Sequence, residues 1–206
     1  MFFDIGANIG KWSLSNISNC DKIIAIEAAP NTFQKLVSNT QKLNNNIICL
    51  NYAVCNSNEE YVDFFNCATD TISTLNGEWL TSSNSRFYKY DKYDVIKCKT
   101  IKLDSLIEQY GVPKLIKIDV EGGEFETISS LTTKVEQLCF EWASETNDVT
   151  FKCIDHLTSL GYEKYAIQYE DNYTFRPTNY FDKETIVNHL NKTTPKKEWG
   201  MIWVIS

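Results

Sequence analysis

The chain has 206 residues, of which 43% are hydrophobic and 23% are charged, and its formal net charge is -7. This composition predicts one globular domain and excludes a disordered or fibrous chain. The negative charge argues against strong nucleic-acid binding, because a phosphate backbone would be repelled. No apolar run approaches the ~18 residues of a membrane span, so we expect none.

Seven cysteines are spread along the chain, and no two of them form a Cys-x-x-Cys pair. This pattern favours neither a zinc site nor a disulfide framework. Cysteines inside apolar runs, such as Cys49 and Cys139, are interpreted as buried, reduced thiols. We therefore expect a reducing compartment, the cytoplasm.

In the first 50 residues, short apolar runs alternate with longer amphipathic stretches, which is typical of parallel βαβ units. Pro30 suits the first turn of a helix, because its fixed φ matches the helix and its missing N–H is not needed there. We expect strands at 2–5, 22–26 and 47–50, and helices at 9–18 and 31–43.

Residues 52–100 interrupt this alternation, and we interpret them as an insertion with hairpin strands at 60–65 and 95–101. The alternation then resumes without repeats or linkers, so residues 1–206 are predicted to form one domain. The chain opens directly on a strand that would be central in the sheet. We therefore expect either a domain of a longer protein, with further domains, or a subunit of an oligomer. The later helices are expected at 103–110, 123–130 and 149–160, and the later strands at 115–120, 138–142, 163–169 and 199–205.

A glycine-containing turn lies between the first expected strand and the first helix: Asp4-Ile5-Gly6-Ala7-Asn8-Ile9-Gly10. This is the context of a nucleotide-binding turn. Gly6 permits a tight turn. Gly10 would remove a side chain that blocks a ligand from the helix N-terminus, where free backbone N–H groups favour a carboxylate or phosphate. The alternative is a turn that only connects a strand to a helix.

An acidic residue follows at the distance that an adenosine site needs. Glu27 ends the next expected strand, 21 positions after Gly6, where it could accept hydrogen bonds from both ribose hydroxyls. The spacing Gly-x-x-x-Gly differs from the Gly-x-Gly-x-x-Gly of dinucleotide sites. S-adenosylmethionine has no phosphate, and the pattern fits it better than a dinucleotide.

Five segments together resemble the FkbM family of methyltransferases. Their order and spacing match across residues 2–130, and the likeness weakens beyond residue 142. The resemblance implies an α/β, three-layer Rossmann-like methyltransferase fold of class I, with a mostly parallel seven-stranded sheet and an antiparallel last strand. It also implies S-adenosyl-L-methionine as cofactor and methylation of hydroxyl groups on sugars, glycans or glycosylated natural products. The segments are Phe2-Phe3-Asp4-Ile5-Gly6-Ala7-Asn8-Ile9-Gly10, Ile26-Glu27-Ala28-Ala29-Pro30, Asn51-Tyr52-Ala53-Val54, Leu103-Asp104-Ser105-Leu106 and Ile116-Lys117-Ile118-Asp119-Val120-Glu121-Gly122-Gly123-Glu124.

By this resemblance, the glycine turn would receive the methionine end of the cofactor, and the acidic strand end would receive its ribose. Asn51 to Ala53 would lie near the adenine. From its position at a strand end, Asp119 is expected near the transferred methyl group. The expected cofactor-binding residues are thus Asp4, Gly6, Ala7, Asn8, Gly10, Glu27, Ala28, Asn51, Ala53 and Asp119.

Three carboxylates are candidates for the chemistry. Methyl transfer is an in-line displacement, so the protein must position an acceptor oxygen, exclude water and often remove a proton. Asp119 and Glu121 lie at the C-terminal end of an expected strand, where ligands bind in open α/β sheets. Glu141 ends the next strand and is expected to face Asp119. Glu124 fits a catalytic role and a purely structural role at a helix N-terminus equally well.

A divalent metal and two histidines are further options. Asp119 and Glu141 could bind Mg²⁺ that orients a sugar diol, although the sequence names no third ligand. His156 falls in an expected helix and is interpreted as structural. His189 lies where no element is predicted, and either histidine could be the base.

Several aromatic residues are candidates for acceptor binding. The segment Phe87–Tyr93 could stack on sugar rings as a lid, stack on bases, or cover the sheet edge. Trp142 follows Glu141 and is the preferred sugar-stacking residue. Trp199 and Trp203 are expected in the core.

The sequence thus predicts an S-adenosylmethionine-dependent O-methyltransferase that acts on a saccharide or glycan, with Asp119 near the methyl group and Glu121 or Glu141 assisting the acceptor. A ribose 2′-O-methyltransferase of nucleic acid would use the same core, but the negative charge and scarce arginine argue against it. The pattern also leaves open a non-catalytic module that binds an adenosyl ligand, and an NAD-dependent oxidoreductase.

Overall fold

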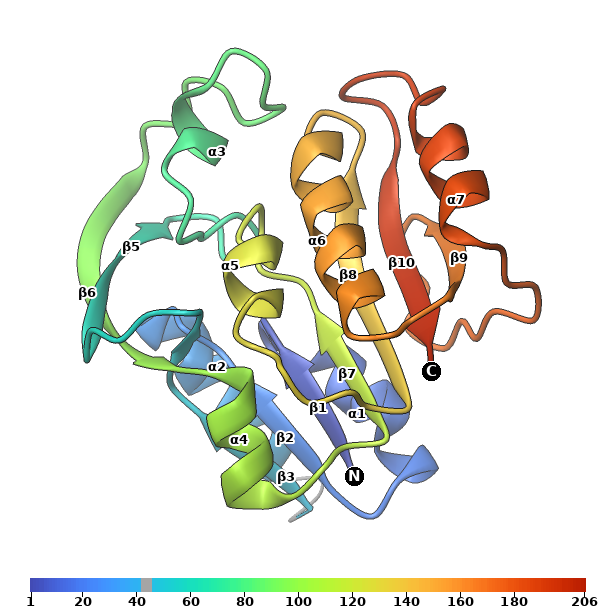
Figure 1. The fold of residues 1–206 in the computed structure, drawn as a ribbon. Helices are drawn as coiled ribbons and strands as arrows, with labels where there is room; N and C mark the ends of the chain where they lie inside the picture. Colours follow the sequence, from blue (N-terminus) through green and yellow to red (C-terminus); the bar gives the residue numbers. More distant parts are fainter. Residues whose placement is uncertain (42–45) are drawn as a thin grey trace.

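The computed structural model describes residues 1–41 and 46–206 and contains one seven-stranded sheet with helices on both faces (Figure 1). The strand order is β3-β2-β1-β7-β8-β10-β9. The strands are β1 (Phe2–Ile5), β2 (Ile23–Ile26), β3 (Ile47–Leu50), β7 (Leu115–Ile118), β8 (Gln137–Ala143), β9 (Lys164–Tyr169) and β10 (Trp199–Ile205).

The centre of the sheet is parallel and buried on both faces. β1 pairs with β2 and β7 so that Phe3 lies opposite both Ile24 and Ile116. All four residues of each of these three strands are buried, and all are apolar except Asp4 and Lys117, which explains why these strands do not alternate apolar and polar residues. β10 is antiparallel to both β8 and β9. The predicted Rossmann-like fold, with its antiparallel last strand, is confirmed.

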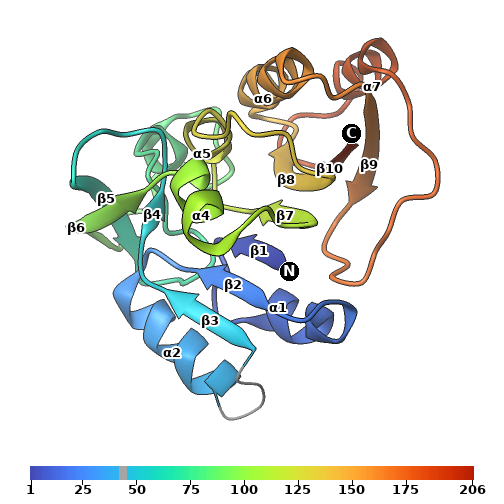
Figure 2. The ribbon, with the colours of Figure 1, turned by 60° about the horizontal axis from the view of Figure 1, so that its bottom comes forward.

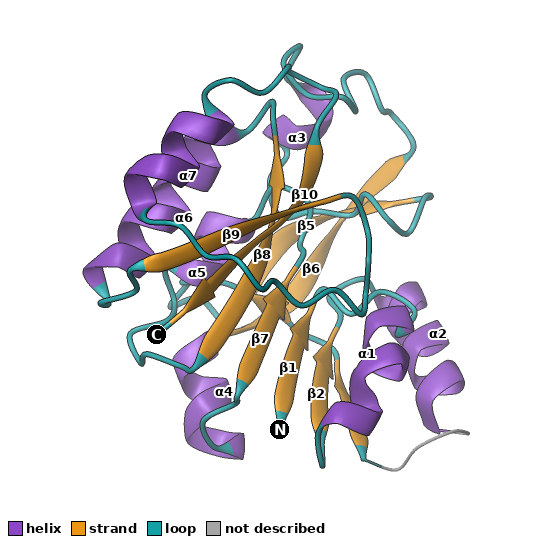
Figure 3. Cartoon of the chain, turned by 90° about the vertical axis from the view of Figure 1, so that its right-hand side faces the viewer, coloured by secondary structure: helices purple, strands orange, loops and turns teal. Residues whose placement is uncertain are grey.

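Helices cover the two faces unequally (Figures 2 and 3). One face packs against α4, α5 and α6, through the buried residues Leu106, Ile128 and Leu157. The other packs against α1 and α2 through Trp12 and Leu36, and beyond them against aromatic residues of the loop after β9. The helices are α1 (Lys11–Asn16) with a 3₁₀ turn at Ile17–Asn19, α2 (Pro30–Gln41), α4 (Leu103–Tyr110), α5 (Glu124–Ile128), α6 (Asn147–Ser159) and α7 (Lys183–Leu190).

The predicted insertion forms a second, smaller sheet. Its antiparallel hairpin consists of β5 (Tyr61–Cys67) and β6 (Tyr93–Ile101), and the short β4 (Ala53–Val54) pairs with β6 in parallel. The segment between the hairpin strands carries the helical turn α3 (Glu78–Thr81), which lies beyond the end of the hairpin in Figure 1. The insertion therefore extends toward the edge of the main sheet where the parallel strands end.

Most expected elements are confirmed, with differences at their ends. The strand expected at 115–120 stops at Ile118, because residues 119–123 form a turn with left-handed φ at Glu121 and Gly122. The helix expected at 31–43 begins at Pro30, and its last two expected positions lie outside the described residues. Helix α7 was not predicted. None of the described helices is long and apolar enough to cross a membrane.

Candidate active site

A cavity of about 580 Å³ lies at the carboxyl ends of β1, β2, β7 and β8. This is where ligands bind in open α/β sheets. Residues that follow these strands line it, together with the segment 69–75 of the insertion and several aromatic side chains. Its volume falls within the range of ordinary ligand pockets.

The glycine turn is shaped by packing as much as by any ligand. Gly6 has φ +72°, and a Cβ atom there would lie 1.8 Å from the carbonyl oxygen of Asp119. Gly10 has φ +89°, and a Cβ atom there would lie 2.9 Å from Leu36 and 3.0 Å from Thr40 of α2. The expectation that Gly10 clears space for a ligand is wrong: it lets α1 approach α2, and it does not line the cavity.

The backbone amides of the turn are already used within the protein. The N–H groups of Gly6 and Ala7 both donate to the carbonyl of Ile26, and that of Gly10 donates to Ala7. The Asn8 N–H donates to Glu27, and the Ile9 N–H donates to the Asn8 side chain. These five amides of the turn are thus not open to a carboxylate, because the turn folds back on β2, whereas Lys11 and Trp12 at the start of α1 line the cavity.

Glu27 directly follows β2 and lines the cavity. Its two carboxylate oxygens accept one backbone N–H each, from Asn8 and Ala29, both at 2.9 Å. Burial raises the pKa of Glu27 to about 7. Each oxygen accepts a single hydrogen bond here, which leaves it capacity to accept a ligand hydroxyl.

Asp4 lies behind the turn rather than in the cavity. Its carboxylate is fully buried, accepts a hydrogen bond from the Ser13 hydroxyl at 2.6 Å, and lies 3.2 Å from the ammonium of Lys117. Lys117 also lies 3.3 Å from the carboxylate of Asp119 and donates to the Gly6 carbonyl at 2.9 Å. The expected ligand contact of Asp4 is thus replaced by an ion pair that holds the turn against β7.

Asn51 likewise supports the site from outside. Its side chain donates to the carbonyls of Glu27 and Ala28, at 2.8 and 3.0 Å, and it does not line the cavity. Its neighbours Tyr52 and Ala53 do line the cavity, as does Ala28. Asn51 therefore orients the residues around it.

Three carboxylates meet at the other end of the cavity. Asp119, Glu121 and Glu141 each offer an oxygen, and these atoms lie within 4.8 Å of one another. Burial raises the pKa of both glutamates well above its usual value, and the charge of Asp119 raises it further. Such a donor set fits a hard divalent cation such as Mg²⁺, with Glu121 as the third ligand that sequence reasoning could not name.

Aromatic side chains surround this acidic end. Phe87 and Tyr90, from the aromatic segment singled out in the sequence, line the cavity. Trp79 lies in van der Waals reach of Gly122, where a Cβ atom would approach its ring to 3.2 Å. Trp199 and Tyr173 complete the wall. The cavity thus has one end that combines carboxylates with aromatic faces.

A family model described as the methyltransferase FkbM domain matches residues 4–164. The chain belongs to the FkbM methyltransferase family. A curated relative, the hexuronic acid methyltransferase AglP of Haloferax volcanii, is 28% identical over 142 residues, which make up 68% of this chain and 53% of AglP. This FkbM-family chain therefore spans about half the length of that relative.

Two solved structures resemble the FkbM-family chain in fold. One is described as a precorrin 8w decarboxylase from Methanobacterium thermoautotrophicum, with a TM-score of 0.50 and 9% identity. The match covers 100% of this chain and 80% of the decarboxylase chain. The other is a precorrin-6y C5,15-methyltransferase from Geobacter metallireducens GS-15, with a TM-score of 0.47 and 12% identity over 98% and 77% of the two chains. At such low identity the likeness concerns the fold alone.

Several expected site residues of the FkbM-family chain lie elsewhere. Trp142 is buried in the core and donates to the Gln168 carbonyl, so it is not the sugar-stacking residue. Successive strand residues point to opposite faces, so Glu141 and Trp142 cannot both face the cavity. Trp199, which was expected in the core, lines the cavity instead, whereas Trp203 is buried as predicted.

The remaining acidic and basic candidates are structural. The Glu124 carboxylate accepts the backbone N–H groups of Val120 and Gly122, at 3.2 and 3.3 Å, and does not line the cavity. His156 contacts the Leu131 carbonyl and His189 contacts the Tyr169 hydroxyl, and neither lines the cavity. The acid cluster is therefore the remaining source of a base among the candidates.

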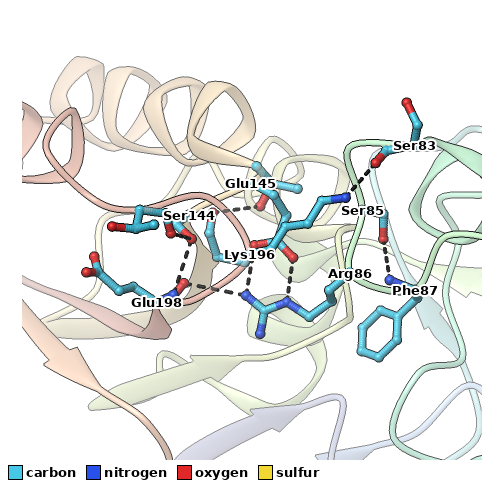
Figure 4. A network of polar contacts seen from close by, with 11 residues as sticks. Ser83, Ser85, Arg86, Phe87, Ser144, Glu145, Lys196 and Glu198 are labelled. Atoms are coloured by element: carbon cyan, nitrogen blue, oxygen red, sulfur yellow. Dashed lines mark hydrogen bonds and ion pairs between the residues drawn. The ribbon is translucent and has the colours of Figure 1, made fainter.

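Sequence reasoning missed Lys117, Arg86, Asp171 and Tyr173, which all line the cavity. A lysine inside the apolar run of β7 was a usable signal, because a buried ammonium requires a partner. Arg86 carried no such signal. Figure 4 shows why it matters: its guanidinium forms a two-pronged ion pair with Glu145 and reaches the Glu198 carbonyl at 3.5 Å. This network joins the insertion to the ends of β8 and β10.

Proposed function

We propose that this FkbM-family chain binds S-adenosyl-L-methionine and transfers its methyl group to a hydroxyl of a sugar or glycan. The observation that carries the proposal is that one cavity joins Glu27 to the cluster of Asp119, Glu121 and Glu141. The family supports methyl transfer, and the name of the relative AglP supports a sugar acceptor.

The cofactor would lie along the ends of β1 and β2. Glu27 would accept hydrogen bonds from the ribose hydroxyls, since its oxygens face the cavity and are held by two backbone amides. Ala28, Tyr52 and Ala53 would contact the adenine side. The turn would contribute its shape at Ala7, and the start of α1, at Lys11 and Trp12, would border the same part of the cavity.

The chemical step needs a placed acceptor oxygen and a proton acceptor. The cofactor, when bound, supplies a methyl group on a positively charged sulfur, whose S–C bond electrons return to sulfur as the acceptor oxygen bonds to carbon. Asp119, held by Lys117, would orient the acceptor hydroxyl. Glu121 or Glu141 would take its proton, because a carboxylate with a raised pKa is a better proton acceptor near neutral pH.

The proposal is tested in two stages. Calorimetric titration with S-adenosylhomocysteine should detect binding, and Glu27→Ala should weaken it by about tenfold or more, because two charge-assisted hydrogen bonds are lost. Methyl transfer from labelled cofactor to a panel of saccharides, with and without EDTA, should then be detected by mass spectrometry. Undiminished binding by Glu27→Ala, or no product from any saccharide, would refute the corresponding part.

A further inference from the structure

The acceptor end of the cavity is crowded with carboxylates. Besides the cluster of Asp119, Glu121 and Glu141, Asp171 lines the cavity at an exposed position. Desolvation of its carboxylate raises the pKa of Asp171, and the charge of Asp119 raises it further. Besides burial, repulsion among these acids raises the pKa of Glu121 and Glu141, and an anionic acceptor would add a further negative charge to the set.

Three cationic side chains among the described residues line the cavity, and each lies near a carboxylate: the charge of Lys11 acts to lower the pKa of Asp171. The ammonium of Lys117 lies between Asp4 and Asp119, at 3.2 and 3.3 Å. The guanidinium of Arg86 is bound through two nitrogen atoms to Glu145, whose side chain is only 2% exposed (Figure 4). The charge of each of these last two cations is balanced by its carboxylate partner, and replacing that partner with an acceptor carboxylate would leave a buried carboxylate unpaired.

Hydroxyl groups suit the same surroundings. A carboxyl group can accept a hydrogen bond in either protonation state, and a sugar hydroxyl donates one. The rings of Trp199, Phe87 and Tyr90 line the same cavity as the acids, and aromatic rings pack well against the C–H faces of a sugar. A neutral sugar offers hydroxyl donors to the acids and C–H faces to the rings, and it carries no charge that the cavity would have to neutralise.

We propose that the acceptor of this chain is an uncharged polyhydroxy sugar, and that the cavity discriminates against sugars that carry a carboxylate. This inference rests on the proposed methyl transfer to a sugar hydroxyl. It separates this chain from the curated relative, whose name specifies a hexuronic acid. The physical basis is that like charges placed together at a binding site oppose association.

The test compares matched acceptor pairs that differ only at C6: aryl glucoside with glucuronide, and aryl galactoside with galacturonide. Initial rates are measured at pH 8, with and without EDTA. We expect kcat/KM for the neutral member of a productive pair to exceed that for the uronide by at least about tenfold, as one unfavourable charge contact of modest strength implies. A uronide that is used equally well or better, in either condition, overturns the inference.

Glu145→Gln provides a second, gain-of-function test. It releases the guanidinium of Arg86 from its carboxylate partner, so uronides should gain at least about fivefold relative to neutral sugars. Glu136→Gln makes the same chemical change at an exposed residue, 65% exposed and distant from the cavity lining, and should leave the ratio unchanged. An unchanged ratio in Glu145→Gln that still methylates neutral sugars contradicts the inference.

Asp171→Asn is the alternative test variant if Glu145→Gln does not fold. It removes one carboxylate at the rim and should narrow the preference for neutral sugars, and an unchanged or widened preference counts against the inference. The failure of the proposed function has a different signature: neither member of any pair is methylated, although S-adenosylhomocysteine binds. That result overturns both statements, whereas methylation of uronides overturns only the present one.

Discussion

The affinity of this chain for an adenosyl ligand should depend on pH through Glu27. The ribose hydroxyls would donate to its carboxylate, so the ligand favours the ionised form. Because burial raises the pKa of Glu27 to about 7, about nine-tenths of the free protein is ionised at pH 8 and about one-tenth at pH 6. Affinity should therefore rise with pH, and the Kd for S-adenosylhomocysteine should be about tenfold lower at pH 8 than at pH 6.

Calorimetry between pH 5.5 and 8.5 measures this profile, with Glu27→Gln as the control. A glutamine has one acceptor oxygen in place of two, so it can keep only one of the amide bonds from Asn8 and Ala29. Its affinity should be lower by about 1–3 kcal/mol, the cost of an unsatisfied buried group, and nearly independent of pH in this range. A flat profile for the unmodified chain, or the same slope in Glu27→Gln, would refute the reasoning.

Three further predictions concern the turn and the acceptor end. Lys117→Met leaves the buried carboxylate of Asp4 without its cation, and denaturant unfolding should show a loss of about 3–5 kcal/mol; a loss below about 1 kcal/mol would mean that the ion pair contributes little. Gly6→Ala places a Cβ atom 1.8 Å from a backbone oxygen at φ +72° and should prevent stable folding. Gly111→Ala is the control, because its φ is +94° and the nearest atom to its Cβ would lie at 3.8 Å; it should lower the free energy of unfolding by only about 1–2 kcal/mol. Equal thermal shifts in the two glycine variants would argue against the close approach. Trp199→Ala removes an aromatic wall of the acceptor end and should raise the acceptor KM about tenfold while the Kd for S-adenosylhomocysteine stays unchanged; an altered cofactor Kd would place this residue at the wrong end.

The order of elements could be predicted because it depends on local patterns. The four-residue runs at Phe2–Ile5, Ile23–Ile26 and Leu115–Ile118 are buried on both faces, and such strands are predominantly apolar, here with Asp4 and Lys117 as the exceptions. The hairpin likewise follows from two strand-forming runs that frame a polar stretch. Helix α7 escaped prediction because its buried residues, Ile186 and Leu190, are too few to mark a periodic face.

The candidate site could be predicted only in part. The identity of Glu27 follows from its position after a strand and its distance from Gly6. The meeting of Glu121 with Glu141 depends on the pairing of β7 and β8, and the closeness of Arg86 to Glu145 depends on how the insertion folds over the sheet.

The sequence by itself determined the parallel sheet, the glycine bend and the acidic residue after the second strand, because burial and backbone freedom act over a few neighbouring positions. Only the tertiary structure decided which groups remain available to a ligand. In the folded chain, amides of the turn donate to Ile26 and Glu27. Trp142 is buried, whereas Trp199 lines the cavity. Lys117 and Arg86 both form ion pairs with carboxylates. Hydrogen bonds, ion pairs and packing at this site join residues far apart in the chain. No short stretch of sequence therefore shows which groups bond to one another and which remain available to a ligand.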